Sequence, residues 1–416
     1  MNKRILHLLV LVLFLTAGIN LFAVGEKEEP VDYPPEMDAW LQEAKLGPYE
    51  GEQDWNEIEQ LANDEGEVII YSSSSRVAKV AAVFEEEYPG IKVTFFDLGS
   101  VGTVEKTISE QDANLFNTDV ITTGGSGQVI HELLGNYRLV NFVPDMYVDQ
   151  IPEELREPLL ARIVEGYVLL YNQEFYGNTP PISNIWELTE EKWRGKVVLK
   201  DPMASLTNKM GLWTMVQHAD EFEKAYKELN GEKIVLHENV PDAGYEFIFR
   251  LLHNDLIILG SGSKVAKASG AKGQTDPPIA ITGYTYIRYN ASKEYVNALV
   301  TPLTPFENIV TPVYTAIARQ APHPNAAKLF TKFLLGDINI TLDTEISEPY
   351  NEGESARLLQ GLGPYYEPGS KSPRDTVPVA KGGEGWYDLD SWIVDPDFMW
   401  YEGLKVQDFW VQEVGN

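Results

Sequence analysis

One pattern of residues recurs four times along this chain and constrains its fold more than any other feature. Each time, a short β-branched strand runs into a loop of Gly, Ser and Thr, and the loop runs into an amphipathic helix. The four segments are 68–88, 119–134, 196–216 and 256–270. Strands that alternate with helices in this way are typical of parallel α/β sheets. The helix of the first segment is expected to bury the residues at helical spacing, which are Val77, Val80, Ala81 and Phe84.

The four loops are expected to meet. In open parallel sheets, the loops after the carboxyl ends of the strands face the ligand crevice, and each loop here opens a helix whose free N–H groups attract an anion or a polar oxygen. One Ser or Thr at such a place is more often a helix cap than a ligand contact. The loops hold more hydroxyl groups than capping needs, so we expect a binding cleft. Its expected residues are Ser73, Ser74, Ser75, Thr123, Gly124, Gly125, Ser126, Ser205, Thr207, Ser261 and Ser263.

The N-terminal residues predict export. Lys3 and Arg4 precede an apolar run, and Ala23 and Gly25 are spaced like a cleavage site, so residues 1–25 are expected to be a cleaved signal peptide rather than an uncleaved anchor. The chain has no cysteine, which excludes disulfides and lipid attachment through cysteine. We therefore expect a periplasmic protein without a lipid anchor. Residues 26–53 are acidic, with Pro and Gly, and are expected to form a surface arm.

The charge of the chain limits its partners. The formal net charge is −30, which makes nucleic acid an unsuitable partner and favours cationic ligands at long range. An anionic ligand would need a locally positive pocket. No His pair has metal-ligand spacing, and no P-loop, nucleophile elbow or dinucleotide fingerprint is present in the sequence.

Five stretches, in this order, carry a family resemblance. They are EEEYPGIKVTF, NTDVITTGG, EGYVLLYNQEFYG, NIWELTEEKWRGKVVLKDP and APHPNAAKLFTKFLLGD. Their order over residues 66–340 resembles that of the periplasmic substrate-binding proteins of bacterial ABC importers, in the cluster named for ferric-ion uptake. The resemblance implies the type II periplasmic-binding-protein fold, with two Rossmann-like α/β lobes that are joined by crossover strands and close on a solute.

The resemblance also implies a division of the chain. Residues 54–164 would start the first lobe, 165–289 would form the second lobe, and 290–341 would return to the first. Such a protein is a carrier and not an enzyme, needs no cofactor, and as a monomer delivers its solute to an inner-membrane permease. Residues 342–416 are rich in Pro, Gly and aromatic residues and are expected to wrap over the lobes.

The residues expected of an iron-binding member are partly missing. Ferric-binding relatives place a His in the first Ser-rich loop, a Glu after the second strand, and two adjacent tyrosines later. Here Ser75 and Gly124 stand at the first two positions, and Thr285 separates Tyr284 from Tyr286. No metal site is therefore assigned, although one of the two tyrosines is expected to touch the solute.

Relatives that bind phosphorylated sugars or phosphonates use Ser, Thr and backbone N–H groups at these loops. Arg76 and Arg288 lie within three residues of a loop or strand end and suit oxyanion recognition, as do Lys209 and Lys264 less directly. A phosphorylated sugar or phosphonate is the expected solute. Ferric ion held by tyrosines with an exogenous anion, a polyol and a polyamine stay open, as does a hydrolase or phosphatase using Asp119 or Asp201.

Overall fold

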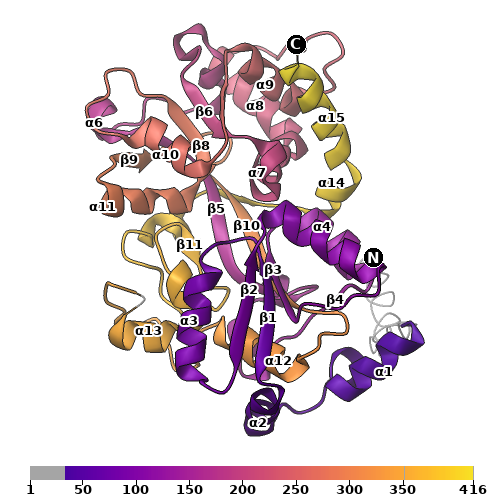
Figure 1. Cartoon of the computed structure of the whole chain (residues 1–416). Helices are drawn as coiled ribbons and strands as arrows, with labels where there is room; N and C mark the ends of the chain where they lie inside the picture. The colour runs from indigo at the N-terminus through magenta and orange to yellow at the C-terminus, as the bar shows by residue number, and fades with distance from the viewer. Residues whose placement is uncertain (1–32, 351, 416) are drawn as a thin grey trace, which may run out of the picture.

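The computed structural model describes residues 33–350 and 352–415, so the expected signal peptide lies outside the described residues. The chain forms two α/β lobes, which lie one above the other in Figure 1. Within the described ranges, no helix has the length and apolar character that crossing a membrane requires. The two-lobed architecture that the sequence predicted is confirmed.

A single mixed sheet runs through both lobes. Its main strands, in spatial order, are β2 (Lys92–Asp97), β1 (Glu67–Ser72), β3 (Val120–Thr123), β10 (Asn308–Ala318), β5 (Ala161–Asn172), β8 (Ile279–Gly283), β6 (Val197–Lys200) and β7 (Ile257–Leu259). β1 is parallel to β2 and β3 in the lower lobe, and β6 is parallel to β7 and β8 in the upper lobe. Each lobe therefore has its own parallel half-sheet.

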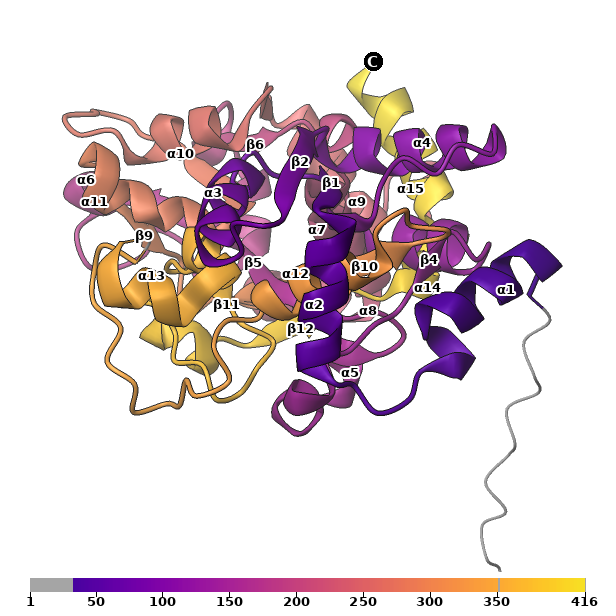
Figure 2. The same ribbon diagram turned by 60° about the horizontal axis from the view of Figure 1, so that its bottom comes forward.

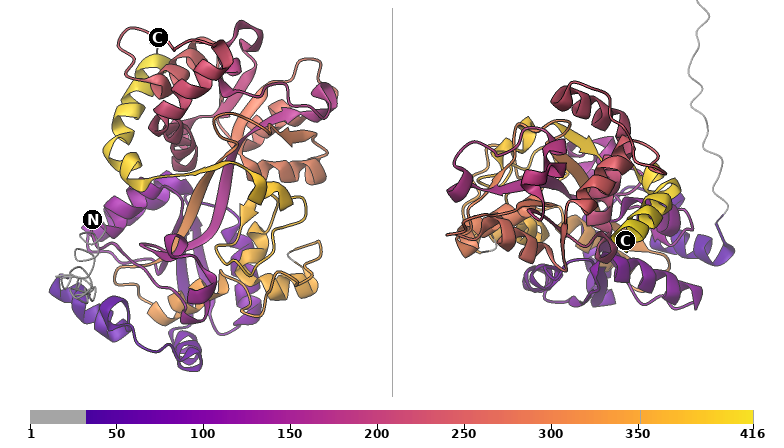
Figure 3. Two further views of the ribbon diagram at one scale, coloured as in Figure 1. Left: turned by 180° about the vertical axis from the view of Figure 1, so that it is seen from behind. Right: turned by 90° about the horizontal axis from the view of Figure 1, so that it is seen from above.

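Two long antiparallel strands, β5 and β10, connect the lobes. Both are buried along nearly their whole length, which is why their sequences are mostly apolar and show no regular alternation of apolar and polar residues. Seen from behind, they run from one lobe to the other (Figure 3). The crossover expected at residues 165–172 lies within β5.

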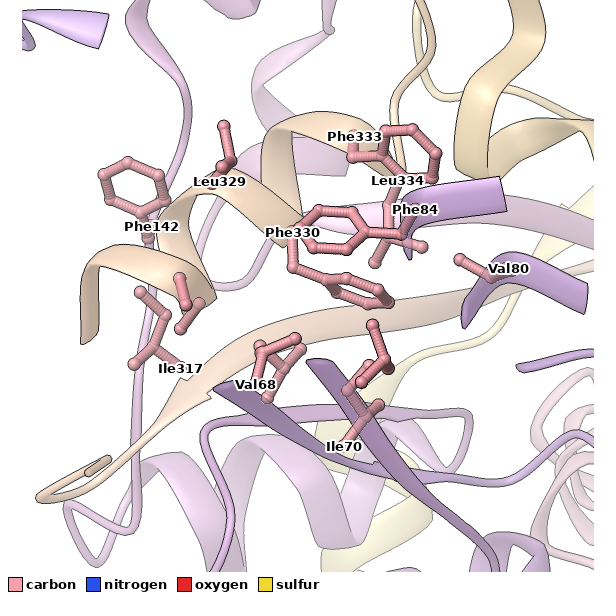
Figure 4. Close-up of a cluster of buried hydrophobic side chains, with 14 of the residues drawn as sticks. Val68, Ile70, Val80, Phe84, Phe142, Ile317, Leu329, Phe330, Phe333 and Leu334 are labelled. Atoms are coloured by element: carbon pink, nitrogen blue, oxygen red, sulfur yellow. The ribbon is translucent and has the colours of Figure 1, made fainter. Parts of the chain in front are cut away.

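The lower lobe packs helices on both faces of its half-sheet. Its helices are α2 (Trp55–Glu65), α3 (Val77–Glu87), α4 (Gly99–Asp112), the π-helix η2 (Gln128–Leu134), α5 (Glu153–Arg156) and α12 (Pro324–Phe333). Figure 4 shows the core between α3, β1 and α12. The Phe84 ring of α3 lies 5.2 Å from that of Phe330 and 5.1 Å from that of Phe333. All four residues expected on the inner face of α3 are buried.

The upper lobe packs its helices around the half-sheet of β6, β7 and β8. They are α6 (Gln173–Tyr176), α7 (Leu206–Gln217), α8 (Ala219–Asn230), α9 (Ala243–His253), α10 (Gly262–Gly270) and α11 (Tyr289–Lys293). Four of these helices begin at a side-chain cap, supplied by Asn172, Ser205, Asp242 and Ser261. β9 (Asn297–Leu299) pairs with the upper end of β5. The chain expected to return at residue 290 therefore enters the lower lobe only along β10.

Residues 33–53, the described part of the acidic N-terminal segment, are packed more closely than their composition suggested. Helix α1 (Pro35–Ala44) buries Met37, Leu41 and Ala44 in the core of the lower lobe, and α1 and α2 lie on the underside in Figure 2. The buried Lys328 donates hydrogen bonds from Nζ to the carbonyl oxygens of Ala44 and Lys45. Spacing by four and three residues gives α1 one apolar stripe despite its acidic surface, so these residues do not form a free surface arm.

The C-terminal residues cross both lobes (Figure 3). They form α13 (Gly353–Leu359), the 3-10 helix η8 (Gln360–Tyr365), β11 (Ser370–Lys371), β12 (Ser391–Ile393), α14 (Pro396–Tyr401) and α15 (Gly403–Val414). The remaining strand, β4 (Leu139–Val140), belongs to the lower lobe and pairs with β10. β11 pairs with β5, and β12 pairs with β10. α14 contacts the lower lobe, where His131 Nε2 lies 2.8 Å from Asp397 Oδ1, and α15 contacts the upper lobe, where Phe409 packs on Tyr245.

Candidate ligand-binding site

The loops that the sequence singled out converge on a cavity of about 660 Å³ between the lobes. This volume is typical of a site for a small organic ligand. Of the residues expected in the cleft, those that line this cavity are Ser73, Ser74, Ser75, Arg76, Gly124, Ser205, Thr207, Ser261, Ser263, Tyr286 and Arg288. The parallel half-sheets bring them together because the carboxyl ends of β1, β3, β6 and β7 all face the space between the lobes.

The hydroxyl groups of these loops divide into two kinds. Ser205 and Ser261 accept hydrogen bonds from the backbone N–H groups of Asn208 and Lys264, so they cap α7 and α10 as well as lining the cavity. The side chains of Ser73, Ser75 and Thr207 have no hydrogen-bond partner among the described residues. Hydroxyl groups that do not serve as caps are therefore present in both lobes.

Three residues of the second loop lie behind the cavity wall instead of on it. Thr123 and Ser126 are buried, with the Thr123 hydroxyl donating to the Gly124 carbonyl and the Ser126 hydroxyl 3.3 Å from that of Tyr314. Gly125 has a φ of +111°, and a Cβ there would lie 2.6 Å from Leu206 Cδ1. Because this loop turns inward toward α7, only Gly124 reaches the cavity.

Tyr284 does not line the cavity either. If residues 284–286 were extended, both tyrosines would lie on one face. They instead begin the 3-10 helix η7 (Tyr284–Arg288), so Tyr284 turns into the core, where its ring stacks on Trp386 at 5.8 Å. Tyr286 faces the cavity together with Tyr289, and their ring centroids are 5.7 Å apart.

Arg162 is a cavity residue that the sequence analysis missed. It lies in a β-bulge, because Ile163 pairs with Val313 and Ala161 with Tyr314, which leaves Arg162 without a residue opposite it. A bulge re-aims the side chain it carries. An arginine within a mostly apolar strand was the signal that could have identified this position.

The guanidinium group of Arg162 has few partners. Arg162 is only 2% exposed, its Nε makes no hydrogen bond, and no carboxylate of the described residues pairs with it. Its contact is with Tyr365 of the C-terminal segment, whose ring centroid is 3.9 Å from Cζ. A buried cation without a counter-charge is costly. Arg162 therefore favours an anion in the cavity.

Arg76 and Arg288 differ from Arg162 because both have an anionic partner. Glu367 Oε1 accepts from Arg76 Nη2 at 2.6 Å and from Arg288 Nη1 at 3.1 Å. Burial raises the pKa of Glu367, although both arginines oppose this shift. Arg76 comes from the lower lobe and Arg288 from the upper lobe, so Glu367 of the C-terminal segment joins the two lobes.

The upper lobe adds a further cation and a perturbed phenol. Lys200, at the end of β6, lines the cavity, and burial lowers its pKa despite the nearby Asp201. Burial alone would raise the pKa of Tyr289, but its hydrogen bond with Ser263 and the charges of Arg288 and Lys293 lower it. Tyr289 is therefore a better hydrogen-bond donor than an ordinary tyrosine.

Tyr167 of β5 lines the cavity between the two lobes. It is almost completely buried, and its hydroxyl group has no hydrogen-bond partner within the described structure. Burial raises its pKa, so the phenol is neutral. A buried hydroxyl group without a partner is costly, so a ligand that reached it would gain a hydrogen bond.

The other charged candidates lie elsewhere. Lys209 donates to Gln407 of α15, and Lys264 is exposed, so neither lines this cavity. Asp201 caps the turn at Met203. Asp119 is buried and accepts hydrogen bonds from the backbone N–H groups of Ile69 and His323. Neither carboxylate is placed in the cavity beside a hydroxyl nucleophile.

Within residues 33–350 and 352–415, His, Asp and Glu side chains form no group of three or more that could hold a metal ion. Among the oxygen-bearing side chains that line the cavity and could bind a metal ion, Tyr289 has a lowered pKa. Arg288 Cζ lies 4.7 Å from the centroid of its ring. A cation bound to the Tyr289 oxygen would therefore have a guanidinium group nearby.

No family model matches this sequence, and no curated protein matches it either. Solved structures do match the fold. The apo ferric ion-binding protein A of Pasteurella haemolytica superposes with a TM-score of 0.61 at 17% identity, covering 84% of this chain and 98% of that one. The periplasmic binding protein AfuA of Actinobacillus pleuropneumoniae, with fructose-6-phosphate bound, gives 0.61 at 18% identity, covering 84% and 99%.

The substrate-binding protein of an ABC transporter from Agrobacterium tumefaciens matches as well, with a TM-score of 0.58 at 14% identity, covering 84% of this chain and 94% of that one. These similarities extend over nearly the full length of each known structure, so they include both lobes and the strands between them. The chain therefore has the type II fold of periplasmic binding proteins, as the sequence predicted.

Proposed function

We propose that this protein is the extracytoplasmic solute-binding component of an ABC importer, and that its solute is a small oxyanion with hydroxyl groups, such as a phosphorylated sugar or a phosphonate. It acts in the periplasm as a monomeric carrier and not as an enzyme. It needs no cofactor and delivers the solute to an inner-membrane permease. The observation that carries the choice of solute is Arg162, a buried cation of the cavity that has no carboxylate partner among the residues described.

The energetics of Arg162 support an anionic ligand. Removing a guanidinium group from water costs several kcal/mol unless a counter-charge and hydrogen bonds compensate. Tyr365 offers its ring face to Arg162, which recovers only about 1–2 kcal/mol. A phosphoryl oxygen would supply both the charge and the acceptors, because Arg suits bidentate recognition of such groups.

The rest of the cavity suits the hydroxyl groups of a sugar. Ser73, Ser75 and Thr207 present unpaired hydroxyls, the Tyr167 hydroxyl is unsatisfied, and Tyr286 and Tyr289 offer ring faces. Sugars are recognised by paired donors and acceptors beside aromatic rings. The net charge of −30 does not prevent anion binding, because carboxylates beyond a Debye length of about 8 Å are largely screened.

Ferric ion is the second candidate solute. Tyr286 and Tyr289 both face the cavity, and the lowered pKa of Tyr289 favours the tyrosinate that ferric ion prefers. An exogenous anion held by Arg162 would complete the coordination shell. We rank this candidate second because the described His, Asp and Glu side chains form no group of three that could hold a metal ion, and because the guanidinium group of Arg288 lies beside both rings.

Calorimetric titration of the ligand-free protein tests the proposal. The titrants are fructose 6-phosphate, a phosphonate, neutral fructose, ferric citrate and spermidine. We expect saturable binding of the phosphorylated or phosphonate compounds. Arg162→Gln should weaken that binding about 10–100-fold, because a hydrogen-bonded charged contact contributes about 1.5–3 kcal/mol.

Two controls separate binding from folding. Arg162→Gln removes an uncompensated buried charge, so the ligand-free variant should be at least as stable as the parent protein. Arg357→Gln changes charge equally at an exposed site where Arg357 pairs with Glu354, and should leave affinity unchanged. Binding of ferric citrate, fructose or spermidine alone, or an Arg162→Gln variant that binds phosphorylated compounds normally, would contradict the proposed solute.

A further inference from the structure

The C-terminal segment supplies part of the wall behind the cleft. Tyr365 lines the cavity, and two residues further on the side chain of Glu367 reaches between the lobes. That side chain is only 12% exposed, and Glu367 lines a second cavity together with Arg288, whereas it does not line the main one. Glu367 therefore lies behind Arg76 and Arg288 as seen from the main cavity.

Both arginines are turned toward this segment. Arg76 donates from Nη2 to Glu367 at 2.6 Å and from Nη1 to the Pro364 carbonyl at 3.5 Å. Arg288 donates from Nη1 to Glu367 at 3.1 Å and to the Thr285 carbonyl at 2.7 Å. Much of their donor capacity, and the positive charge that Glu367 balances, is thus used within the protein.

The carboxylate is held in place by its surroundings. β11 follows Glu367 and pairs with β5 at Glu165 and Val164. Gly369 has a φ of +83° and approaches η7 so closely that a Cβ there would lie 2.5 Å from the carbonyl carbon of Tyr284. A segment fixed on both β5 and η7 cannot easily withdraw its carboxylate when a ligand enters.

Some of the charged side chains that line the cavity have a partner of opposite charge, and others do not. Glu165 also lines the cavity, and its charge acts on Arg76 and on Glu367. Arg76 and Arg288 are thus matched by Glu165 and Glu367. Arg162 and Lys200 line the cavity without an ion pair in the described part of the chain, while Asp97 lies exposed at its edge.

We infer that Glu367 is a specificity-determining residue, which balances Arg76 and Arg288 so that the cleft accepts a ligand with one phosphoryl group and discriminates against one with two. Arg162 and Lys200 together match the charge of about −1.5 to −2 that a phosphate monoester carries at neutral pH. A second phosphoryl group would meet Glu165 on the cavity wall, where like charges are repulsive, and Arg76 and Arg288, whose charge Glu367 already balances, would not compensate it. This inference rests on the proposed function, since it specifies the charge of the proposed solute.

The test measures charge preference by calorimetric titration at pH 8, where phosphate monoesters are fully ionised. The paired probes are fructose 6-phosphate with fructose 1,6-bisphosphate, and inorganic phosphate with pyrophosphate. We expect the parent protein to prefer the probe with one phosphoryl group at least about tenfold. Glu367→Gln keeps the size of the side chain and removes its charge, and should reduce that preference about tenfold or reverse it.

Glu354→Gln is the matched control, since Glu354 lies in the same segment with its side chain 79% exposed and makes only a surface contact with Arg357. It should leave the preference unchanged. Equal or tighter binding of the bisphosphate by the parent protein would overturn the inference, even if Glu367→Gln fails to fold. So would a folded Glu367→Gln variant with the parent preference. Absence of binding by all four probes would refute the proposed oxyanion ligand, and this inference with it.

Discussion

Gly211→Ala is expected to destabilise the protein and weaken solute binding, because the added methyl group would collide with the cavity residue Tyr167. Gly211 lies in the middle of α7, and a Cβ at this position would lie 2.3 Å from Cδ1, 2.6 Å from Cε1 and 2.7 Å from Cγ of Tyr167. These atoms belong to a ring that is 1% exposed, so it cannot swing away into solvent. The ring or the helix has to move.

Two opposing contributions determine how much Gly211→Ala changes the free energy of unfolding. Overpacking a core by one methyl group costs about 1–3 kcal/mol, and a contact this short belongs at the upper end of that range. Replacing Gly by Ala inside a helix returns about 1 kcal/mol. The free energy of unfolding should therefore fall by about 2 kcal/mol. Binding of the solute should weaken as well, because Tyr167 lines the cavity.

Equilibrium unfolding in urea measures the stability change, and calorimetry measures the affinity. Gly385→Ala is the control, since a Cβ at Gly385 has no atom within 4 Å, and its effect should stay within about 0.5 kcal/mol. In the double variant with Tyr167→Leu, the penalty of Gly211→Ala should shrink, because the ring that causes the collision is gone. A Gly211→Ala variant as stable as the parent protein would refute this reasoning.

Three further predictions concern the lower lobe. Phe84→Ala should lower the free energy of unfolding by about 3–5 kcal/mol, because Phe84 is fully buried against Phe330 and Phe333. Urea unfolding measures this loss of stability, and a loss below about 1 kcal/mol would contradict the prediction. The hydrogen bond and ion pair with Asp119 raise the pKa of His323 above its ordinary 6.5, so this pair should stabilise the fold fully below pH 6.5 and lose its contribution as pH rises through the raised pKa. Urea unfolding at pH 6 and pH 9 should show this fall in the parent protein and a smaller one in His323→Gln, and identical pH profiles would count against it. Arg374 is fully buried and donates to the carbonyl oxygens of Leu335, Gly336, Asp337 and Ile338. Arg374→Leu should therefore lower the free energy of unfolding by about 3 kcal/mol or more. Thermal unfolding beside the parent protein measures this loss, and an unchanged melting temperature would show that these hydrogen bonds do not stabilise the fold.

Local pattern predicted the architecture and most of the cleft. The spacing of Val77, Val80, Ala81 and Phe84 identified the inner face of α3 correctly, because helical periodicity depends only on neighbours in sequence. The hydroxyl-rich loops were found for the same reason, since each directly follows a strand. Local pattern could not decide between Tyr284 and Tyr286, because only the 3-10 turn that begins at Tyr284 determines which of the two lines the cavity.

The residues that decide the charge of the cleft could not be read from local pattern. Arg162 faces the cavity because of a bulge that exists only where β5 pairs with β10. Glu367 lies 291 residues after Arg76 in the chain. Nothing in the C-terminal sequence indicates that its side chain reaches between the lobes. Side chains brought together by such long-range pairing have no periodic signal.

The sequence by itself determined two parallel α/β lobes, the loops that face each other between them, and the net acidity of the chain, because these follow from period, composition and order of segments. The tertiary structure alone decided which cations stay unpaired. An arginine in a strand or a loop is the same residue whether or not a carboxylate lies beside it. Only the folded chain, in which Glu367 pairs with Arg76 and Arg288 and Arg162 has no ion pair among the described residues, shows where the unpaired positive charge lies.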